Sequence, residues 1–229
     1  MIRATAICAA ILLASASTPA MSQQRSNRAL ATVITAYEQT ARRYDPLTSA
    51  SEGDRAALRV LPDSSRESDM RQRAELVALK ARLERVPTRG LNEEDALNRA
   101  YLMRVIDQSI QGIDLDFGRA PISNGDGYFT FGDYLAYTTP IQSVDDAEAW
   151  LSRLSALPAM YRQSVANARR GIETGYTQPR IIVDRALATA RAQVATMEQT
   201  LLTPLASMPD TIPAAQQEEF RNRARTIIR

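Results

Sequence analysis

Apolar side chains recur every three or four residues along most of this chain, which is the spacing of amphipathic helices. The spacing predicts a first helix over residues 26–44 and a second over residues 64–86, joined by a turn-rich connector at residues 47–64. Asn92 is placed to cap a third helix with acids in its first turn, where the helix dipole favours negative charge. The predicted core face of this third helix consists of Leu97, Tyr101, Val105 and Ser109, broadened by Leu102, Ile106 and Ile113.

Helical spacing resumes at Ser143, and prolines divide the remainder of the chain. Pro158 is expected to start a new helix, because proline is favoured at the first helical position. Pro179 is expected to open a longer helix that Pro204 breaks, and a last helix is expected over residues 216–229. The side chains expected to face inward are Trp150, Leu151, Leu154 and Leu157, then Tyr161, Val165, Ala168 and Ile172, and finally Ile182, Val183, Ala186, Ala190, Val194, Met197 and Leu201.

No stretch alternates apolar and polar positions over more than a few residues, and no repeat of fixed period is present. The sequence therefore predicts an all-α fold, an irregular multi-helix array over residues 23–229. Residues 114–139 are the one region without a clean helical period, and they are rich in glycine and aromatic residues.

The first 22 residues have the pattern of a secretory signal peptide. Arg3 gives the positive start, residues 4–17 form the apolar run, and small residues offer cleavage after Ala20 or Ser22. The run is shorter than the stretch of about 18 residues that spans a membrane. We therefore expect an exported protein, periplasmic or secreted, with no membrane attachment after the leader is cleaved.

The residue types present exclude several kinds of chemistry. The chain contains no histidine, and its one cysteine, Cys8, lies in the predicted leader. These absences exclude Ser-His and Cys-His nucleophile pairs, histidine-based zinc sites and an H-E-x-x-H peptidase helix. The 28 basic and 26 acidic residues are interspersed, which argues against nucleic-acid binding. We therefore predict no catalytic residue, no metal ligand and no cofactor in this chain.

One short segment resembles a calcium-binding loop. Asn124 and Asp126 match the third and fifth positions of an EF-hand loop, where alternate residues supply oxygen ligands. The first position is Ile122, however, and the last is Asp133 rather than glutamate, so much of the oxygen cage is lost. We therefore favour a polar glycine turn that leads into a helix beginning near Tyr128.

Aromatic residues gather between positions 117 and 137. They could line a ligand pocket, since such pockets are apolar with a few polar groups, or they could fill the core. We favour the core for the cluster as a whole. Because long irregular connections are uncommon unless they are functional, we name Asp126, Tyr128 and Tyr134 as candidate ligand-binding residues.

Four segments, taken in order, resemble a known family. Residues 171–180 read Gly-Ile-Glu-Thr-Gly-Tyr-Thr-Gln-Pro-Arg, which resembles the G-I-x-x-G-x-T-x-P-R stretch of the bacterial domain of unknown function 885 (DUF885) family. Residues 145–158 resemble its "eDyeayLaRLraLP" run, and residues 91–98 resemble its "Ls.eD.lny" helix start. Residues 44–53 resemble its "dP..at..G" segment.

The resemblance implies a secreted or lipid-anchored α-helical protein of more than twice this length. The C-terminal half of such proteins is similar to zinc metallopeptidases and carries an H-E-x-x-P-G-H segment, which nothing in this chain matches. The chain is thus expected to be the non-catalytic N-terminal half of a metallopeptidase-like body, inactive by itself. Zinc is expected only in the missing C-terminal half, and the expected partner is that half or a peptide.

The last predicted helix has neither a cap nor a stop signal, so we expect the chain to be truncated at its C-terminus. Its apolar stripe is then expected to lack a partner; the stripe consists of Phe220, Ala224, Ile227 and Ile228. The rival hypothesis is a stand-alone periplasmic helical binding or scaffold protein that uses a pocket at residues 117–137.

Overall fold

The structure is a computed structural model that describes residues 27–229. Within this range the chain forms eight α-helices, three short 3-10 helices and one isolated β-bridge, which confirms the all-α prediction. The predicted signal peptide and Cys8 lie outside the described residues. None of the described helices is both long and apolar enough to cross a membrane.

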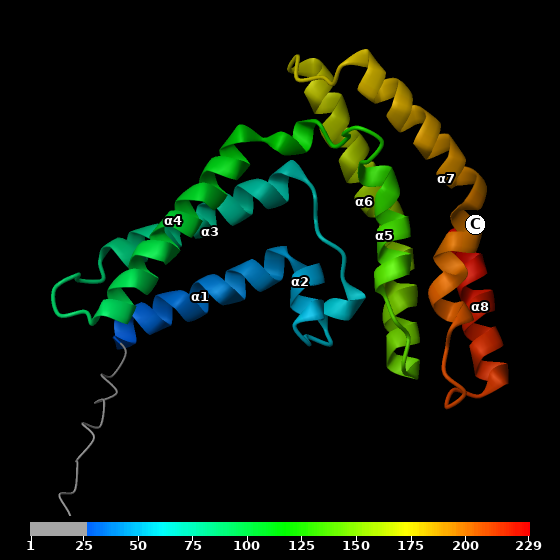
Figure 1. The fold of residues 1–229 in the computed structure, drawn as a ribbon, viewed down its shortest axis with the longest axis horizontal. Coiled ribbons are helices and arrows are strands. Elements are labelled where there is room, and N and C mark those ends of the chain that lie inside the picture. Colours follow the sequence, from blue (N-terminus) through cyan, green and yellow to red (C-terminus); the bar gives the residue numbers. More distant parts are fainter. Residues whose placement is uncertain (1–26) are drawn as a thin grey trace, which may run out of the picture.

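Three long helices form the first of two groups (Figure 1): α1 (Arg28–Tyr44), α3 (Arg66–Glu84) and α4 (Glu93–Leu115). Each begins close to its predicted start, because a polar side chain accepts a hydrogen bond from an otherwise unpaired N–H of the first turn. The three capping residues are Asn27, Ser65 and Asn92. The shared core of this group consists of Leu30, Val33, Leu76, Leu79, Leu83, Val86, Leu102 and Ile106.

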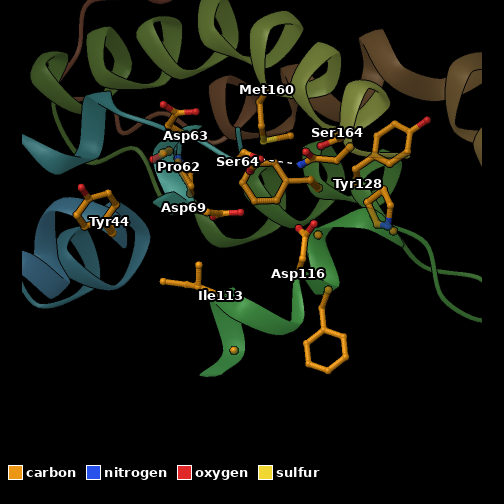
Figure 2. Close-up of a pocket in the computed structure, with 18 of the residues that line it drawn as sticks. Tyr44, Pro62, Asp63, Ser64, Asp69, Ile113, Asp116, Tyr128, Met160 and Ser164 are labelled. Atoms are coloured by element: carbon orange, nitrogen blue, oxygen red, sulfur yellow. Dashed lines mark hydrogen bonds between the residues drawn. The ribbon is translucent and has the colours of Figure 1, made fainter. Parts of the chain in front are cut away.

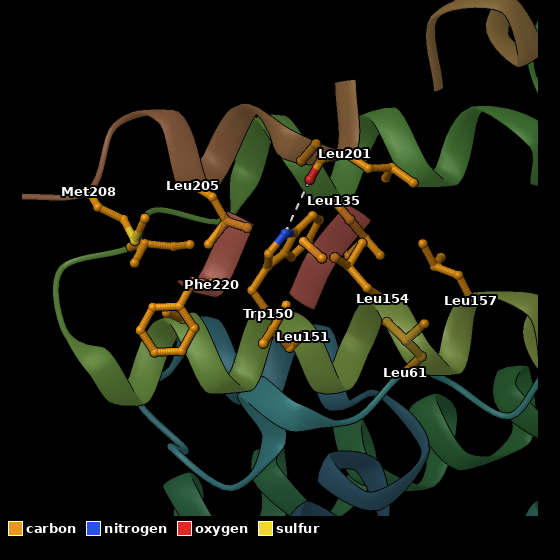
Figure 3. Packing of buried hydrophobic residues seen from close by; sticks show 14 of the residues in the cluster. Leu61, Leu135, Trp150, Leu151, Leu154, Leu157, Leu201, Leu205, Met208 and Phe220 are labelled. Atoms are coloured by element: carbon orange, nitrogen blue, oxygen red, sulfur yellow. Dashed lines mark hydrogen bonds between the residues drawn. The ribbon is translucent and has the colours of Figure 1, made fainter. Parts of the chain in front are cut away.

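The second group comprises α5 (Phe131–Thr138), α6 (Val144–Glu173), α7 (Arg180–Ala206) and α8 (Ala214–Ile228) (Figure 1). Ser143 caps α6, as predicted, by accepting a hydrogen bond from the Asp146 N–H. Trp150 lies at the centre of this group, and its indole Nε1 donates to the backbone carbonyl of Leu201, at 3.2 Å (Figure 3). The buried tryptophan therefore joins α6 to α7 by both packing and a hydrogen bond.

The segment between α1 and α3 joins the two groups. The predicted turn-rich connector, residues 47–64, lies here and includes most of the short helix α2 (Pro46–Ser51) and the 3-10 helix η1 (Ala57–Arg59). Side chains of α6 bind its backbone. Asn167 Nδ2 donates to the Ser64 carbonyl at 2.7 Å, and an Arg153 nitrogen donates to the Ala57 carbonyl at 3.1 Å. These contacts fix the position of the first group against α6.

Two predicted helix breaks are wrong, because α6 continues through Pro158 and α7 continues through Pro204. An interior proline costs about 3 kcal/mol, since it removes one backbone hydrogen bond and crowds the preceding turn. Burying a large apolar side chain contributes about 1.5–3 kcal/mol, and buried residues flank both prolines. Around Pro158 these are Leu154, Leu157 and Met160; around Pro204 they are Leu201 and Leu205. Packing therefore outweighs the proline cost at both sites.

The predicted inward faces are wrong along parts of three helices. In the second half of α6 the buried residues are Met160, Ser164, Asn167 and Gly171, one position before each predicted residue. In α4, Leu97 and Tyr101 are exposed, while Leu102 and Ile106 pack against α3. In α7, Val183, Val194 and Met197 are exposed, and burial is concentrated near its C-terminal end. Successive residues of an α-helix point about 100° apart. A predicted inward face that is displaced by one residue therefore names exposed residues as buried.

The stripe on α8 is covered, contrary to expectation. Phe220 and Ala224 are buried in the second core, and Ile227 and Ile228 pack against that core while remaining partly exposed. The partners come from within the chain, because α8 packs against both α6 and α7.

Candidate functional site

The largest cavity of the described chain lies where the two helical groups meet. It has a volume of about 1010 Å³ and opens to solvent (Figure 2). One wall comes from the connector and α3, a second from the end of α4 and the 3-10 helix η2 (Phe117–Arg119), and a third from α6. The 3-10 helix η3 (Tyr128–Thr130) and the start of α5 complete the lining. The cavity is thus built from segments that are far apart in the sequence.

All three candidate ligand-binding residues, Asp126, Tyr128 and Tyr134, line this cavity. A tight turn presents Asp126, because the Ser123 N–H donates to the Asp126 carbonyl at 2.8 Å and Gly125 adopts a positive φ of 80°. Tyr128 begins η3 directly after the turn, and its ring lies edge-on to that of Phe129. The fold therefore brings these residues to one surface.

The polar glycine turn leading into a helix near Tyr128 is confirmed. Its oxygen atoms are engaged within the protein, since Asn124 Oδ1 accepts from Arg185 at 2.7 Å and Asp126 accepts from the Gly127 N–H at 2.7 Å. Asp126 also accepts from the Thr130 hydroxyl, and these two hydrogen bonds lower the pKa of the Asp126 carboxyl. The turn is therefore stabilised by its own side chains.

The expectation that the aromatic cluster fills the core is wrong. None of the aromatic side chains between residues 117 and 137 is buried; Phe117, Tyr134 and Tyr137 are exposed, and Tyr128, Phe129 and Phe131 are intermediate. Four of them, Phe117, Tyr128, Phe131 and Tyr134, line the cavity. The physical reason is that Leu135 and Ala136 supply the inward face of α5, so that Tyr134 and Tyr137 stay exposed while Phe131 packs against the edge of the core.

Two further carboxylates, Asp69 of α3 and Asp116 after α4, line the cavity and were not predicted (Figure 2). Asp116 adopts a left-handed φ of 52° and forms ion pairs with Arg170 at 2.8 Å and Arg119 at 3.2 Å. Burial raises the pKa of the Asp69 carboxyl; the Arg66 guanidinium opposes this shift, while the Asp116 carboxylate adds to it. The Arg66 guanidinium lies 3.8 Å from Asp69, so Asp69 has only a long ion pair.

Ser164 and Asn167 of α6 also line the cavity and were missed, since the predicted inward face was one residue out of phase. Both are buried although both are polar. The signal that could have found them is their spacing, because they continue the face of Leu157 and Met160 by steps of three and four residues. A polar pair on the buried face of a helix indicates either a hydrogen-bonded contact or a site. Here Asn167 provides the contact with Ser64.

The lining carries acidic side chains and no basic ones, and arginines outside it form ion pairs with Asp63, Asp69 and Asp116. It contains four carboxylates, Asp63, Asp69, Asp116 and Asp126, and no lysine or arginine, because the arginines that pair with Asp63 and Asp116 lie outside the lining. Within residues 27–229, Asp126 forms no ion pair. Tyrosine and phenylalanine rings attract cations over their faces. The arrangement therefore suits an ammonium or guanidinium group attached to an apolar body.

The donor atoms of this chain do not fit the zinc that the resemblance implies for the larger body. Structural and catalytic zinc sites use histidine, cysteine and carboxylate ligands, usually with at least one of the first two. The chain has no histidine, and residues 27–229 contain no cysteine. In the same range no three acidic side chains gather closely enough to hold a metal ion.

Comparison with known proteins identifies a family. The family described as "Bacterial protein of unknown function (DUF885)" matches residues 46–229, which covers all of α2 to α8. No curated protein matches the chain, and no solved structure matches it either. The matched region includes every residue of the cavity lining except Tyr44. The chain therefore belongs to the DUF885 family of bacterial proteins.

Proposed function

We propose that this chain is an exported, non-catalytic helical part of a zinc-metallopeptidase-like protein, and that its cavity binds basic peptides. The observation that carries the proposal is the cavity of about 1010 Å³, lined by carboxylates and aromatic rings. This volume is at the upper end of the range of about 300–1,000 Å³ that is typical of ligand pockets, which suits a short peptide segment. The pattern of the first 22 residues supports export.

Binding of a basic side chain would engage Asp69 and Asp126 first. Asp69 is partly buried with only a long ion pair, so a cation placed beside it would offset the cost of burying its charge. The Asp126 carboxylate accepts hydrogen bonds from residues next to it in the sequence, and it forms no ion pair with a basic residue among residues 27–229. Tyr128 and Tyr134 would lie against the apolar part of the peptide.

Hydrolysis of the bound peptide is not part of the proposed role. Peptide hydrolysis by a metallopeptidase requires a metal-activated water, and this chain lacks the ligands for zinc. The exposed apolar residues of α7 support a position within a larger helical body; they are Ile181, Val183, Leu187, Val194 and Met197. Exposed apolar residues that share one helix face, as Val183, Leu187 and Val194 do at helical spacing, are typical of an interface. We therefore place the catalytic residues in a separate C-terminal half.

The second candidate function is a stand-alone periplasmic binding or scaffold protein. The same cavity favours it, because residues 27–229 supply both the carboxylates and the aromatic rings of the lining. The two candidates differ at α7, which a stand-alone protein would leave exposed.

Isothermal titration calorimetry of the full chain tests peptide binding. The probes are the N-acetylated, C-amidated tetrapeptides Gly-Phe-Lys-Gly and Gly-Phe-Glu-Gly, which differ only in the sign of one charge. We expect the lysine peptide to bind at least about tenfold more tightly, because a charge-assisted hydrogen bond contributes about 1.5–3 kcal/mol. Equal affinities, or tighter binding of the glutamate peptide, would overturn the proposal.

Matched variants locate the binding. Asp69→Asn and Asp126→Asn should each reduce affinity for the lysine peptide by about tenfold, since each removes one charge from the lining. Asp114→Asn is the control, because Asp114 is an exposed acid of α4 that pairs with Arg73 and lies outside the lining. A loss of affinity in the control equal to that in the two cavity variants would show a general charge effect and contradict the assignment.

A further inference from the structure

A second, smaller cavity lies beside the first and has a different character. Its volume is about 390 Å³, and it is lined by residues of α2, η1, the C-terminal half of α5 and the first part of α6. Tyr134 lines both cavities, so the two lie next to each other. The walls of the smaller cavity are mainly apolar; they include Leu47, Ala50, Leu58, Leu135 and Pro140. The charged groups in its lining are Arg55, Asp146 and Arg153.

Arg153 is the unusual residue of this cavity, because it is a buried cation without a counter-charge. Only 4% of its surface is exposed. One terminal nitrogen donates to the Ala57 carbonyl at 3.1 Å, while Nε is buried without any acceptor. No acidic residue among residues 27–229 forms an ion pair with Arg153, and burial alone lowers the pKa of its guanidinium. The Nε donor of this side chain is therefore buried and unused.

The other two charges of the lining already neutralise each other. Arg55 forms ion pairs with Asp146 at 2.7 Å and with Asp145 at 2.8 Å. Asp146 also accepts hydrogen bonds from the Ser143 hydroxyl at 2.8 Å and from the Gln142 N–H at 3.1 Å. The Asp146 carboxylate is thus already paired with groups of the protein, and these contacts hold the first turn of α6 in place. The unsatisfied positive charge of the cavity is that of Arg153.

A buried charge that lacks a partner is costly, and proteins rarely keep one without a reason. A guanidinium presents five N–H donors in a planar fork that matches a carboxylate. A carboxylate entering the smaller cavity would pair with this fork, and the apolar walls would contact whatever carbon chain it carried. We infer that the smaller cavity is a binding site for a carboxylate with a small apolar body, held by Arg153.

This inference is independent of the proposed function, since it rests on a different cavity and on the opposite charge. The carboxylate that binds Arg153 could belong to a free short-chain acid or to the C-terminal residue of a peptide. A free acid needs only the smaller cavity. A peptide C-terminus would place its last residue there and extend past Tyr134 into the larger cavity.

Thermal melting and calorimetry of the full chain with acid and amide pairs test the site. The free-acid pair is butyrate and butyramide, and the peptide pair is N-acetyl-Ala-Ala-Leu as the acid and as the amide. We expect at least one acid to bind about tenfold or more tightly than its amide and to raise the melting temperature, because the amide cannot form the charged pair with Arg153. The pair that shows the difference identifies the source of the carboxylate. If neither acid differs from its amide, the inference is wrong.

The variant Arg153→Met separates binding from structure. Methionine fills a similar volume without a charge, so the ligand-free variant should melt within a few degrees of the unsubstituted chain, and the preference for the acid should disappear. Arg221→Met is the matched control, because Arg221 also donates to a backbone carbonyl, that of Leu205, but pairs with Glu218 outside the cavity. Retention of the acid preference in Arg153→Met, or its loss in the control, would contradict the assignment. The acid–amide comparison on the unsubstituted chain decides the question even if Arg153→Met does not fold.

Discussion

Helices α6 and α7 look alike in sequence but differ in their surroundings. Each is close to thirty residues long, contains one internal proline and has apolar residues at helical spacing. α6 buries twelve residues and contacts the connector, η2, η3 and α8, whereas α7 buries four residues, three of them near its C-terminal end. Val194 in the middle of α7 is 71% exposed, while Trp150 on α6 is fully buried. Apolar periodicity therefore predicts a helix in both cases but indicates burial only where a partner helix is present.

The surfaces that α6 and α7 present also differ in kind. The second half of α6 presents buried polar residues, Ser164 and Asn167, to a cavity with a defined shape. The middle of α7 presents apolar residues to solvent. The first arrangement suits a small charged ligand, and the second suits a broad contact with another helical body.

The largest expected effect comes from truncating the central side chain of α6. Trp150→Ala should lower the free energy of unfolding by about 3–5 kcal/mol, because it leaves a cavity in the second core. It also leaves the Leu201 carbonyl without the indole donor. Val194→Ala on α7 should change the same quantity by less than about 0.5 kcal/mol, as expected for an exposed site. Urea unfolding followed by circular dichroism measures both, and similar effects for the two variants would remove the distinction between the helices.

A smaller but still large effect is expected at the C-terminal end of α6. A Cβ added at Gly171 would lie 2.2 Å from the Arg119 carbonyl oxygen and 2.9 Å from that of Tyr176. Gly171→Ala should therefore destabilise the chain by about 1–3 kcal/mol, since rigid backbone must move. Gly112→Ala in α4 is the control, because nothing lies within 4 Å of its added Cβ. The control should stabilise the chain by up to about 1 kcal/mol, through the better helix propensity of alanine. A Gly171→Ala variant as stable as the control would show that η2 does not pack tightly against α6.

The exposed face of α7 should affect dye binding rather than stability. Replacing Val183, Leu187 and Val194 together by glutamine should reduce the fluorescence of an apolar-surface dye. Each substitution should change the free energy of unfolding by about 0.5 kcal/mol or less, since these side chains contact little in the chain. Undiminished dye fluorescence, or a loss of stability as large as that of Trp150→Ala, would show that this face is covered.

The smallest expected effect is the pH dependence that Asp69 contributes to stability. Because its folded-state pKa is raised above the ordinary value of 3.8, the folded chain holds the proton more tightly than the unfolded chain. Asp69 therefore opposes folding at neutral pH, and this cost disappears as the pH falls through the raised pKa. Asp69→Asn should melt at a higher temperature than the unsubstituted chain at pH 7, and the difference should narrow as the pH falls toward 4. A difference that instead grows in acid would contradict the raised pKa.

The sequence predicts helix starts better than helix faces. Asn27, Ser65, Asn92 and Ser143 lie at or next to the predicted starts, because a capping hydrogen bond depends only on residues a few positions away. Continuation through Pro158 and Pro204 could not be predicted, since it depends on packing with distant helices. The inward face of α6 was missed by one residue, because a hydrogen bond to the distant Ser64 carbonyl turns Asn167 inward, and Ser164 lies on the same face.

The candidate site was predictable only in part, for a similar reason. Asp126, Tyr128 and Tyr134 belong to one irregular segment whose composition is visible in the sequence, and all three line the larger cavity. Asp69 and Asp116 come from separate helices, so only the tertiary fold brings them to the same surface. Arg153 resembled an ordinary helix arginine until the structure placed it in the interior.

Hydrogen exchange of the full chain, with and without the N-acetylated, C-amidated peptide Gly-Phe-Lys-Gly, tests the central claim most directly. We predict that the peptide slows exchange in residues 116–131, which form one wall of the larger cavity, and leaves the middle of α7 unchanged. The glutamate peptide should produce little protection at the same concentration. Protection confined to residues 181–197 of α7, or protection by both peptides alike, would contradict the claim that the cavity recognises a basic peptide.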